Sequence, residues 1–294
     1  MTDRYAVFGN PVEHSLSPRI HSAFALQTGE NLSYEAIRVP HGGFAYSVSS
    51  FSASGGRGAN VTVPFKEAAC SLCSEMSEAA VVAGAVNTLS FIPPGIVRGD
   101  NTDGIGLIRD LTKNLKCLLT GQRVLLLGAG GAARGVILPL LEQRPARLHI
   151  ANRTAPKGLF LREEFAAHTP NPAILTAGPL RELGRISGGF DIVINATSAE
   201  LDGEALELPQ GVFATEALAY DMSYGVEETA FLSQARTLGA ARCCDGLGML
   251  TEQAAESFLI WRGVRPDTAP VLTLLKTELD LMRRNRAAAS RRTP

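Results

Sequence analysis

The sequence predicts an α/β protein with an N-terminal α/β domain, a second domain built as a doubly wound Rossmann sheet, and C-terminal helices that pack back on the first domain. Three observations predict this fold. Short apolar segments alternate with helical segments along most of the chain, one strand-to-helix turn is rich in glycine, and 294 residues exceed the roughly 100–200 typical of one domain. We therefore expect a cleft between two domains.

The first hundred residues alternate between the two kinds of element. Strands are expected at 4–8, 33–39, 58–63 and 88–92, and helices at 18–28 and 65–76. Pro93-Pro94-Gly95 indicates a turn. The polar run 98–104 is expected to form a hinge loop before a helix at 105–115.

A new pattern begins after Gly121. The expected elements are a strand at 123–127, a glycine turn, an alanine-rich helix to about residue 141 and a strand at 147–151. They form a βαβ unit. Further strands are expected at 173–177, 191–196, 217–221 and 240–244, which continue the unit as a doubly wound parallel sheet.

The last part of the chain is helical by period and composition, at 251–262 and 269–284. These elements give the expected division of the chain. We expect a first domain at 1–104, a Rossmann domain at 105–246, helices returning to the first domain at 247–284 and a flexible tail at 285–294.

Composition limits the classes of function. Lys and Arg number 28 against 29 Asp and Glu, so a net charge of -1 provides no general attraction to nucleic acid or to an anionic membrane. Neither a signal peptide nor a membrane-spanning apolar run is found, and we expect a cytoplasmic protein. The five cysteines are an odd, scattered set, which favours reduced thiols over a disulfide framework. Cys70-Ser-Leu-Cys73 is an isolated CxxC without a second pair, which disfavours a metal site.

A glycine-rich turn follows the strand at 123–127. It reads Gly128-Ala129-Gly130-Gly131-Ala132-Ala133 and matches GxGxxA between a strand and a helix. Gly128 permits the tight turn, and Gly130 lets the backbone approach a pyrophosphate, whose charge the free N–H groups of the helix start receive. The sequence therefore predicts a dinucleotide site.

The end of the next strand indicates which dinucleotide binds. An NAD enzyme of this fold usually carries Asp or Glu there for the ribose 2′-hydroxyl. Here the segment reads Asn152-Arg153-Thr154, and Lys157 follows it. Because a cation and a hydroxyl group would bind a 2′-phosphate that a carboxylate would repel, we predict NADP.

Reducing a ketone requires a proton donor for its oxygen, and the first domain offers Lys66 with Asp103. The ammonium can polarise a carbonyl while the carboxylate holds it in place. Burial would disfavour the charged ammonium and Asp103 would favour it, so two roles stay open, proton donor or orienting group. Each residue also has a purely structural interpretation. Lys66 is then a solvated lysine at the start of a helix, and Asp103 is a helix cap.

These residues fall within motifs that resemble those of the shikimate dehydrogenases, NADP-dependent enzymes that interconvert 3-dehydroshikimate and shikimate in aromatic amino-acid biosynthesis. The matching segments are 8–18, 60–67, 84–88, 101–104, 128–132, 152–154, 195–198, 220–222 and 245–250. A mild departure occurs at Ala199-Glu200-Leu201, where small residues are usual.

The resemblance implies roles for further residues. It implies that Ser15 and Ser17 bind the substrate carboxylate, that Thr62, Asn87, Tyr224 and Gln253 hold its hydroxyls and ring, and that Lys66 with Asp103 is the catalytic pair. It also implies that Met222 and Gly246 lie near the nicotinamide and that Glu78 approaches the cofactor. Ser17 with Pro18 is further expected to cap the following helix, and His14 and His21 are expected to be structural.

Three other interpretations remain open. A quinate/shikimate dehydrogenase would share the motifs but often use NAD, which the absence of an acidic residue at 152–154 disfavours. A catalytically silent nucleotide sensor on the same fold would have no need of the Lys66 and Asp103 pair. An interaction protein would have only the short basic C-terminus for binding. We expect a small-molecule substrate and a monomer or homodimer.

Overall fold

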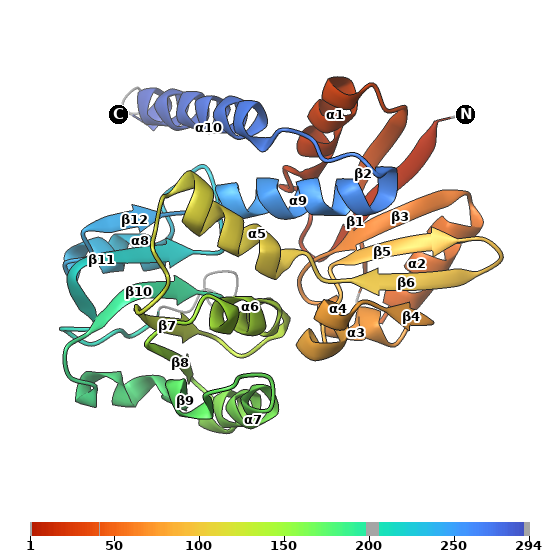
Figure 1. The fold of residues 1–294 in the computed structure, drawn as a ribbon. Helices are drawn as coiled ribbons and strands as arrows, with labels where there is room; N and C mark the ends of the chain where they lie inside the picture. The colour runs from red at the N-terminus through yellow and green to blue at the C-terminus, as the bar shows by residue number, and fades with distance from the viewer. Residues whose placement is uncertain (1, 41, 198–205, 291–294) are drawn as a thin grey trace. The chain divides into compact units, whose positions relative to one another are not determined.

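The computed structural model describes residues 2–40, 42–197 and 206–290, and the chain divides into two compact units (Figure 1). The first unit comprises Met1–Cys117, Arg134–Glu142 and Met249–Thr268, and the second comprises Leu118–Ala133, Gln143–Gly248 and Ala269–Pro294. The mixed α/β fold predicted from the sequence is confirmed. The exact domain boundaries given above stay a prediction.

The first unit contains a six-stranded mixed sheet. Its strands are β1 (Asp3–Gly9), β2 (Leu32–Arg38), β3 (Gly56–Val61), β4 (Glu75–Met76), β5 (Thr88–Ile92) and β6 (Ile96–Asp100). They lie in the order β2-β1-β3-β5-β6-β4. Strands β1, β2 and β3 run parallel, whereas β5 and β6 form an antiparallel hairpin beside β3.

Helices accompany this sheet. They are α1 (Ser17–Thr28), α2 (Phe44–Ala53), α3 (Lys66–Cys70), α4 (Glu78–Ala83), α5 (Asp103–Arg109), the π-helical turn η1 (Asp110–Asn114) and α9 (Leu247–Arg262), of which residues from Met249 onward belong to this unit. Of these helices, α1 packs on β1 and β2, α2 on β3 and α4 on β6. The core contains Phe8 and Leu89 from the strands and Phe44, Val48 and Phe51 from α2. Their spacing of four and three residues places the α2 side chains on one face.

Three elements of the first unit differ from the expectations. Helix α2 was not expected, because serines break up its apolar pattern. The helix expected at 65–76 ends at Cys70, and Glu75–Met76 is strand β4. The hinge loop expected at 98–104 begins inside β6, whose Arg98 and Asp100 pair with β5 although the strand lacks an apolar alternation.

The second unit contains a six-stranded parallel sheet. Its strands are β7 (Arg123–Leu127), β8 (Arg147–Asn152), β9 (Leu175–Pro179), β10 (Phe190–Asn195), β11 (Phe213–Asp221) and β12 (Arg242–Cys244). The order β12-β11-β10-β7-β8-β9 is that of the dinucleotide-binding Rossmann fold, with its switch point between β7 and β10. The predicted doubly wound sheet is therefore confirmed.

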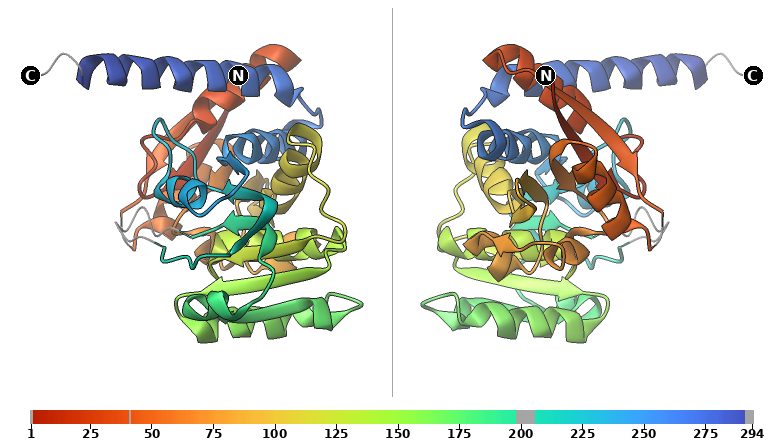
Figure 2. Two further views of the ribbon diagram at one scale, coloured as in Figure 1. Left: turned by 90° about the vertical axis from the view of Figure 1, so that its left-hand side faces the viewer. Right: turned by 90° about the vertical axis from the view of Figure 1, so that its right-hand side faces the viewer.

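The helices that connect and follow these strands are α6 (Gly131–Glu142), α7 (Ala155–Ala166), the 3-10 turns η2 (Pro172–Ile174) and η3 (Leu180–Arg185), α8 (Ala230–Thr237) and α10 (Thr268–Ser290). Residues 134–142 of α6 belong to the first unit. Helix α7 packs on β8 and β9, and α8 on β11 and β12. Figure 2 shows α10 as one unbroken helix, which continues to Ser290 and so beyond residue 284, where we expected it to end. In the part of the chain that the structure describes, no helix is long and apolar enough to cross a membrane.

Candidate active site

Lys66 and Asp103 form an ion pair in the first unit. Lys66 is the first residue of α3 and Asp103 the first of α5, and Lys66 Nζ lies 2.6 Å from Asp103 Oδ2. Only 14% of the lysine side chain and 5% of the aspartate side chain are exposed. The backbone N–H of Val86 donates to Lys66 O over 2.8 Å, which attaches the start of α3 to the segment before β5. The structure thus brings together the two residues predicted to be catalytic.

Asn87 holds the second oxygen of this carboxylate. Its Nδ2 donates to Asp103 Oδ1 over 2.9 Å. The backbone of Asn87 is fixed by its neighbours, since its N–H donates to Asp100 O over 3.1 Å and its carbonyl accepts from the N–H of Val61 over 2.8 Å. The Asp103 carboxylate therefore contacts a cation on one oxygen and an amide on the other.

The rest of the Asn87 amide is bonded within the protein as well. Its Nδ2 also lies 2.9 Å from Thr102 Oγ1 and 3.2 Å from Gln253 Oε1. Its Oδ1 accepts from the backbone N–H of Thr102 and from Thr88 Oγ1, both over 2.9 Å. Gln253, expected to contact substrate, thus belongs to the same cluster as Asn87.

A further layer of hydroxyl and amide groups lies behind Asn87. The Oγ atoms of Thr88 and Ser257 are 2.8 Å apart, and Asn60 Nδ2 donates to Ser257 Oγ over 2.9 Å. Tyr34 donates to Asn60 Oδ1 over 2.7 Å. This layer was not predicted from the sequence, although Asn60 and Thr88 lie in the matching segments 60–67 and 84–88. Ser257 follows Gln253 by four residues on α9, and that spacing could have placed both on one face.

Three other predicted substrate residues lie in the same unit. The backbone N–H of Ser17 donates to Ser15 Oγ over 3.2 Å, and Ser17 is buried at the start of α1. The N-cap position is Leu16 and has no side-chain cap, so the expectation that Ser17 caps this helix is wrong. Thr62 follows β3, and its N–H donates to Phe8 O over 2.9 Å. Among the described residues, no hydrogen bond joins these three side chains to Lys66.

The glycine turn of the second unit follows β7. Gly128 has φ +111°, and a Cβ there would lie 3.0 Å from the carbonyl oxygen of Ala196. At Gly130, by contrast, a Cβ would meet nothing within 4 Å, and α6 begins at the next residue. The turn lies at the carboxyl end of β7, at the switch point of the sheet, where dinucleotides bind in this fold. The open space beside Gly130 fits a pyrophosphate that approaches the backbone.

The end of β8 carries the residues expected to select NADP. Arg153 and Thr154 are exposed, and so is Lys157 on α7. Asn152 Nδ2 donates to Thr154 O over 2.9 Å, which fixes the turn between β8 and α7. An exposed cation and hydroxyl at this place fit a 2′-phosphate.

The remaining predicted residues are distributed over both units. Gly246 donates from its N–H to Ser223 O, and a Cβ on Gly246 would lie 2.3 Å from Met222 O, so Met222 and Gly246 lie side by side. Tyr224 also belongs to the second unit, whereas Glu78 is an exposed first-unit residue at the start of α4. The departure at 199–201 and Ser198 lie outside the described residues.

The two histidines expected to be structural differ in their surroundings. His21 is fully buried and stacks on Tyr34, with ring centroids 4.2 Å apart and planes 4° apart. This burial lowers the pKa of His21 to about 3, so the ring is a neutral member of the aromatic core. His14 is exposed.

The cysteines are free thiols. Burial raises the pKa of Cys73 to about 11 and also raises that of Cys70, which makes both poor nucleophiles. In residues 2–40, 42–197 and 206–290 no group of three or more His, Cys, Asp or Glu side chains could hold a metal ion.

Comparison with known proteins shows the family of this chain. Three family models match the chain, namely the shikimate dehydrogenase substrate binding domain over residues 7–89, the shikimate / quinate 5-dehydrogenase model over residues 110–202 and the shikimate 5'-dehydrogenase C-terminal domain over residues 246–276. The chain belongs to the shikimate dehydrogenase family. The resemblance stated from the motifs is therefore confirmed.

Individual relatives cover nearly the whole chain. The shikimate dehydrogenase (NADP(+)) of Aromatoleum aromaticum is 58% identical over 278 residues, which are 95% of this chain and 98% of that protein. The crystal structure of an Ael1 enzyme from Pseudomonas putida is 46% identical with a TM-score of 0.82 and covers 93% of this chain and 98% of the other. The shikimate 5-dehydrogenase of Thermus thermophilus, solved with NADP(H) and shikimate, is 34% identical with a TM-score of 0.78 over 92% of this chain and 98% of the other.

Proposed function

We propose that this member of the shikimate dehydrogenase family catalyses the reversible NADPH-dependent reduction of 3-dehydroshikimate to shikimate, in the pathway to chorismate and the aromatic amino acids. The observation that supports this proposal most directly is the ion pair between Lys66 and Asp103, whose second carboxylate oxygen is held by Asn87. A silent nucleotide sensor would have no need of such a buried pair. The ion pair thus favours an oxidoreductase acting on a CH-OH group.

The first unit supplies the groups that act on the substrate. Lys66 donates a hydrogen bond to the reacting carbonyl oxygen and stabilises the negative charge that develops there. Asp103 fixes the ammonium of Lys66 at this oxygen, and Asn87 fixes Asp103. Because the reaction turns a carbonyl into an alcohol, the oxygen gains a proton, and the ammonium of Lys66 supplies it.

The remaining substrate contacts follow from the chemistry of the side chains. Ser15 and Ser17 bind the carboxylate through their hydroxyl groups, and Thr62, Tyr224 and Gln253 hold the hydroxyls and the ring. Hydroxyl and amide side chains suit a polyol because each can both donate and accept.

NADP, when bound, supplies or receives the hydride. The second unit would hold its pyrophosphate at Gly128, Ala129, Gly130, Gly131 and Ala132, and its 2′-phosphate at Asn152, Arg153, Thr154 and Lys157. Met222 and Gly246 would line the nicotinamide side, and Glu78 would approach the cofactor. The open backbone beside Gly130 and the exposed Arg153 support this assignment. We further propose a cytoplasmic enzyme that acts as a monomer or homodimer.

A four-way assay tests the proposal. The purified chain is incubated with shikimate or quinate, each with NADP or NAD, and nicotinamide reduction is followed by absorbance. We expect the highest kcat/KM for shikimate with NADP. Faster turnover of quinate, or a preference for NAD, would overturn the assignment of substrate or cofactor, and no turnover with any pair would overturn the proposal as a whole.

A further inference from the structure

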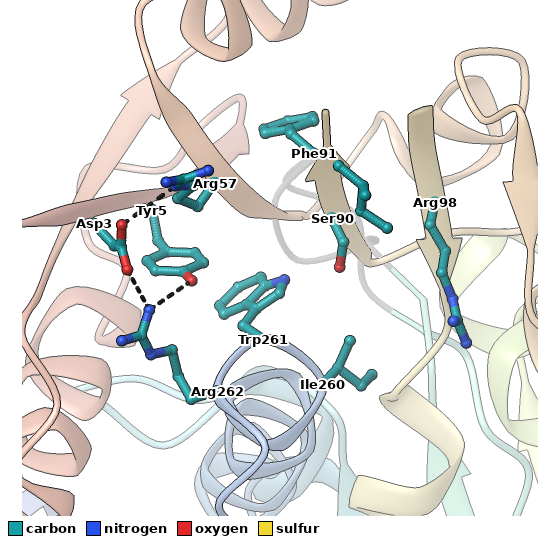
Figure 3. Close-up of a pocket in the computed structure, with 10 residues that line it drawn as sticks. Asp3, Tyr5, Arg57, Ser90, Phe91, Arg98, Ile260, Trp261 and Arg262 are labelled. Atoms are coloured by element: carbon teal, nitrogen blue, oxygen red, sulfur yellow. Dashed lines mark hydrogen bonds and ion pairs between the residues drawn. The ribbon is translucent and has the colours of Figure 1, made fainter. Parts of the chain in front are cut away.

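The first unit contains a hollow that the residues of the candidate active site do not line (Figure 3). Its volume is about 440 Å³, a size that suits a small ligand. Its walls come from the amino end of β1, from β3, from the hairpin of β5 and β6, and from the carboxyl end of α9. Lys66, Asn87 and Asp103 lie elsewhere in this unit.

The floor of the hollow is a rigid aromatic surface. The Trp261 ring stacks on Tyr5 with centroids 4.6 Å apart, and its Nε1 donates to Leu89 O over 3.1 Å. Gly58 makes room for the indole, because a Cβ there would lie 2.6 Å from Nε1. Ile260, partly exposed, lies beside Trp261 in the wall. A flat apolar ring of a ligand would therefore find a surface of matching shape.

A hydroxyl group without a partner lines the same hollow. Ser90 Oγ is inaccessible to bulk solvent and has no hydrogen-bond partner among the described residues. Figure 3 shows its side chain directed between Ile260 and Arg98. Since a buried hydroxyl group is stabilised when it is hydrogen-bonded, Ser90 favours a ligand with an acceptor.

Arg98 provides the charge that goes with this hydroxyl. Ser90 and Arg98 are directly opposite each other in the antiparallel hairpin, so both side chains are on the same face of the sheet. Arg98 Nε lies 3.5 Å from Asp100 Oδ2, and its side chain is half exposed. In the described part of the chain its two terminal nitrogens have no protein partner, which leaves a fork that matches a carboxylate.

Arg57 is a second arginine of the hollow whose Nε faces a carboxylate. Arg57 is the extra residue of a β-bulge, where the register between β1 and β3 shifts from Arg4 with Gly56 to Tyr5 with Gly58. Its Nε lies 3.3 Å from Asp3 Oδ1, and its side chain is half exposed. Because Asp3 also lines the hollow, this pair adds no net charge to the rim, and Arg98 remains the main cation for a ligand.

We propose that this hollow is a binding site for a small carboxylate that carries a planar ring. The carboxylate is bound by the terminal nitrogens of Arg98 and by Ser90 Oγ, and the ring lies on Trp261 beside Ile260. This inference does not depend on the proposed function, because none of these residues belongs to the candidate active site.

Fluorescence of the whole chain tests the site directly. Trp261 is the chain's one tryptophan, so a change in tryptophan emission reports on this hollow. We expect benzoate to change the emission saturably, and benzyl alcohol, which has the ring without the charge, and inorganic phosphate, which has charge without the ring, to bind at least 10-fold more weakly. No saturable change with benzoate, or equal binding of benzyl alcohol, would overturn the proposal.

Variants locate the binding. We expect Arg98→Gln to weaken benzoate binding roughly 10- to 100-fold, because it removes a charge-assisted hydrogen bond, and Ser90→Ala to weaken it less. Arg4→Gln is the matched control, since Arg4 is a half-exposed arginine that lies over the Phe51 ring, outside the hollow, and should leave binding unchanged. Circular dichroism verifies that each variant is folded. Wild-type affinity in both Arg98→Gln and Ser90→Ala would overturn the assignment.

Two further measurements exclude other occupants. Saturating shikimate should leave the benzoate affinity unchanged, and displacement would show that benzoate occupies the substrate site instead. Sedimentation of wild-type and Arg98→Gln protein should give the same mass. Self-association that Arg98→Gln abolishes would mean that a second copy of the chain covers the hollow, and would also overturn the proposal.

Discussion

The side-chain amide of Asn87 donates a hydrogen bond to Asp103 Oδ1 over 2.9 Å, while Lys66 contacts Oδ2 of the same carboxylate over 2.6 Å. A carboxylate held on both oxygens cannot rotate freely, and so the ammonium is fixed as well. The resemblance implied that Asn87 holds substrate. Its bonds within the protein give it an additional task, the positioning of Asp103.

Asn87→Ala tests this positioning. We expect kcat to fall roughly 10- to 100-fold, because in the proposed function a small displacement of Asp103 also displaces the ammonium of Lys66 from the reacting oxygen. The free energy of unfolding should fall by about 1–3 kcal/mol, since Thr88 and Thr102 lose a buried acceptor. Steady-state kinetics and urea denaturation measure the two effects, with Asn114→Ala as the control because its amide bonds Asp110 instead. A raised KM at unchanged kcat would show that Asn87 only binds substrate.

Lys66→Ala should lower turnover roughly 10²–10⁴-fold while leaving the affinity for NADPH nearly unchanged. The reason is that in the proposed function the lost ammonium acts on the reacting oxygen and not on the cofactor. Turnover is measured by absorbance and the dissociation constant of NADPH by calorimetry. Lys276→Ala, an exposed lysine on α10, serves as the control. Unimpaired turnover of the Lys66 variant would refute its catalytic role.

Arg153→Ala should raise the KM for NADP roughly 10- to 100-fold, because it removes the charge-assisted hydrogen bond that we propose between Arg153 and the 2′-phosphate. The KM for NAD, which has no such phosphate, should change little. Initial rates with both cofactors give the selectivity ratio. Arg181→Ala removes an exposed arginine from the same unit and should leave the ratio as it is. Equal changes in the KM for NADP and for NAD would mean that Arg153 does not contact the 2′-phosphate.

Alanine at two glycines of the nucleotide turn should have different effects. Gly128→Ala introduces a Cβ at φ +111° and 3.0 Å from Ala196 O, and we expect a loss of about 1–3 kcal/mol in the free energy of unfolding. In Gly130→Ala the new Cβ lies in open space, so the free energy of unfolding should stay unchanged. NADPH should bind at least 10-fold more weakly, because the Cβ keeps the pyrophosphate from the backbone. Urea denaturation followed by circular dichroism and calorimetric titration separate the two. Wild-type affinity in folded Gly130→Ala would contradict a pyrophosphate at this backbone.

His21 should make stability depend on pH. Burial lowers the pKa of His21 to about 3 in the folded chain, against about 6.5 in the unfolded chain. Below pH 6.5 the unfolded state therefore binds the extra proton, and the free energy of unfolding falls by about 1.4 kcal/mol per pH unit until about pH 3. From pH 6.5 to pH 5 the His21 contribution is about 2 kcal/mol.

The His21→Phe variant isolates this contribution. Phenylalanine keeps an aromatic ring among Tyr34, Phe24 and Phe258 but takes up no proton. We expect its urea midpoint to fall less than that of the wild type between pH 6.5 and pH 5. His14→Phe, at an exposed position, should keep the wild-type dependence. Parallel curves for His21→Phe and wild type would contradict the expected protonation.

The sequence allowed accurate prediction where one local signal determines structure. The strand before Gly128 and the helix after it follow each other directly in the sequence, so their apolar pattern and the glycines between them predicted the Rossmann unit. Strand β6 could not, because Arg98 and Asp100 are polar and their place is fixed by pairing with β5. Pairing across strands is a tertiary effect that periodicity does not record.

The candidate site shows the same limit. Motifs indicated Lys66 and Asp103. The hydrogen bond from Asn87 to Asp103 depends on the position of the residue before β5 relative to the start of α5, which the motifs do not give. The unpartnered hydroxyl of Ser90 gives no signal in the sequence at all, since it is defined by what surrounds it. Contacts between residues far apart in the chain had to come from the structure.

The position of Trp261 has a consequence for how unfolding is observed. As the chain's one tryptophan it belongs to the first unit, and tryptophan emission therefore follows the melting of that unit, whereas circular dichroism follows the helices of both. If the two signals change at the same urea concentration, the units unfold cooperatively, and if they separate, each unit has a stability of its own.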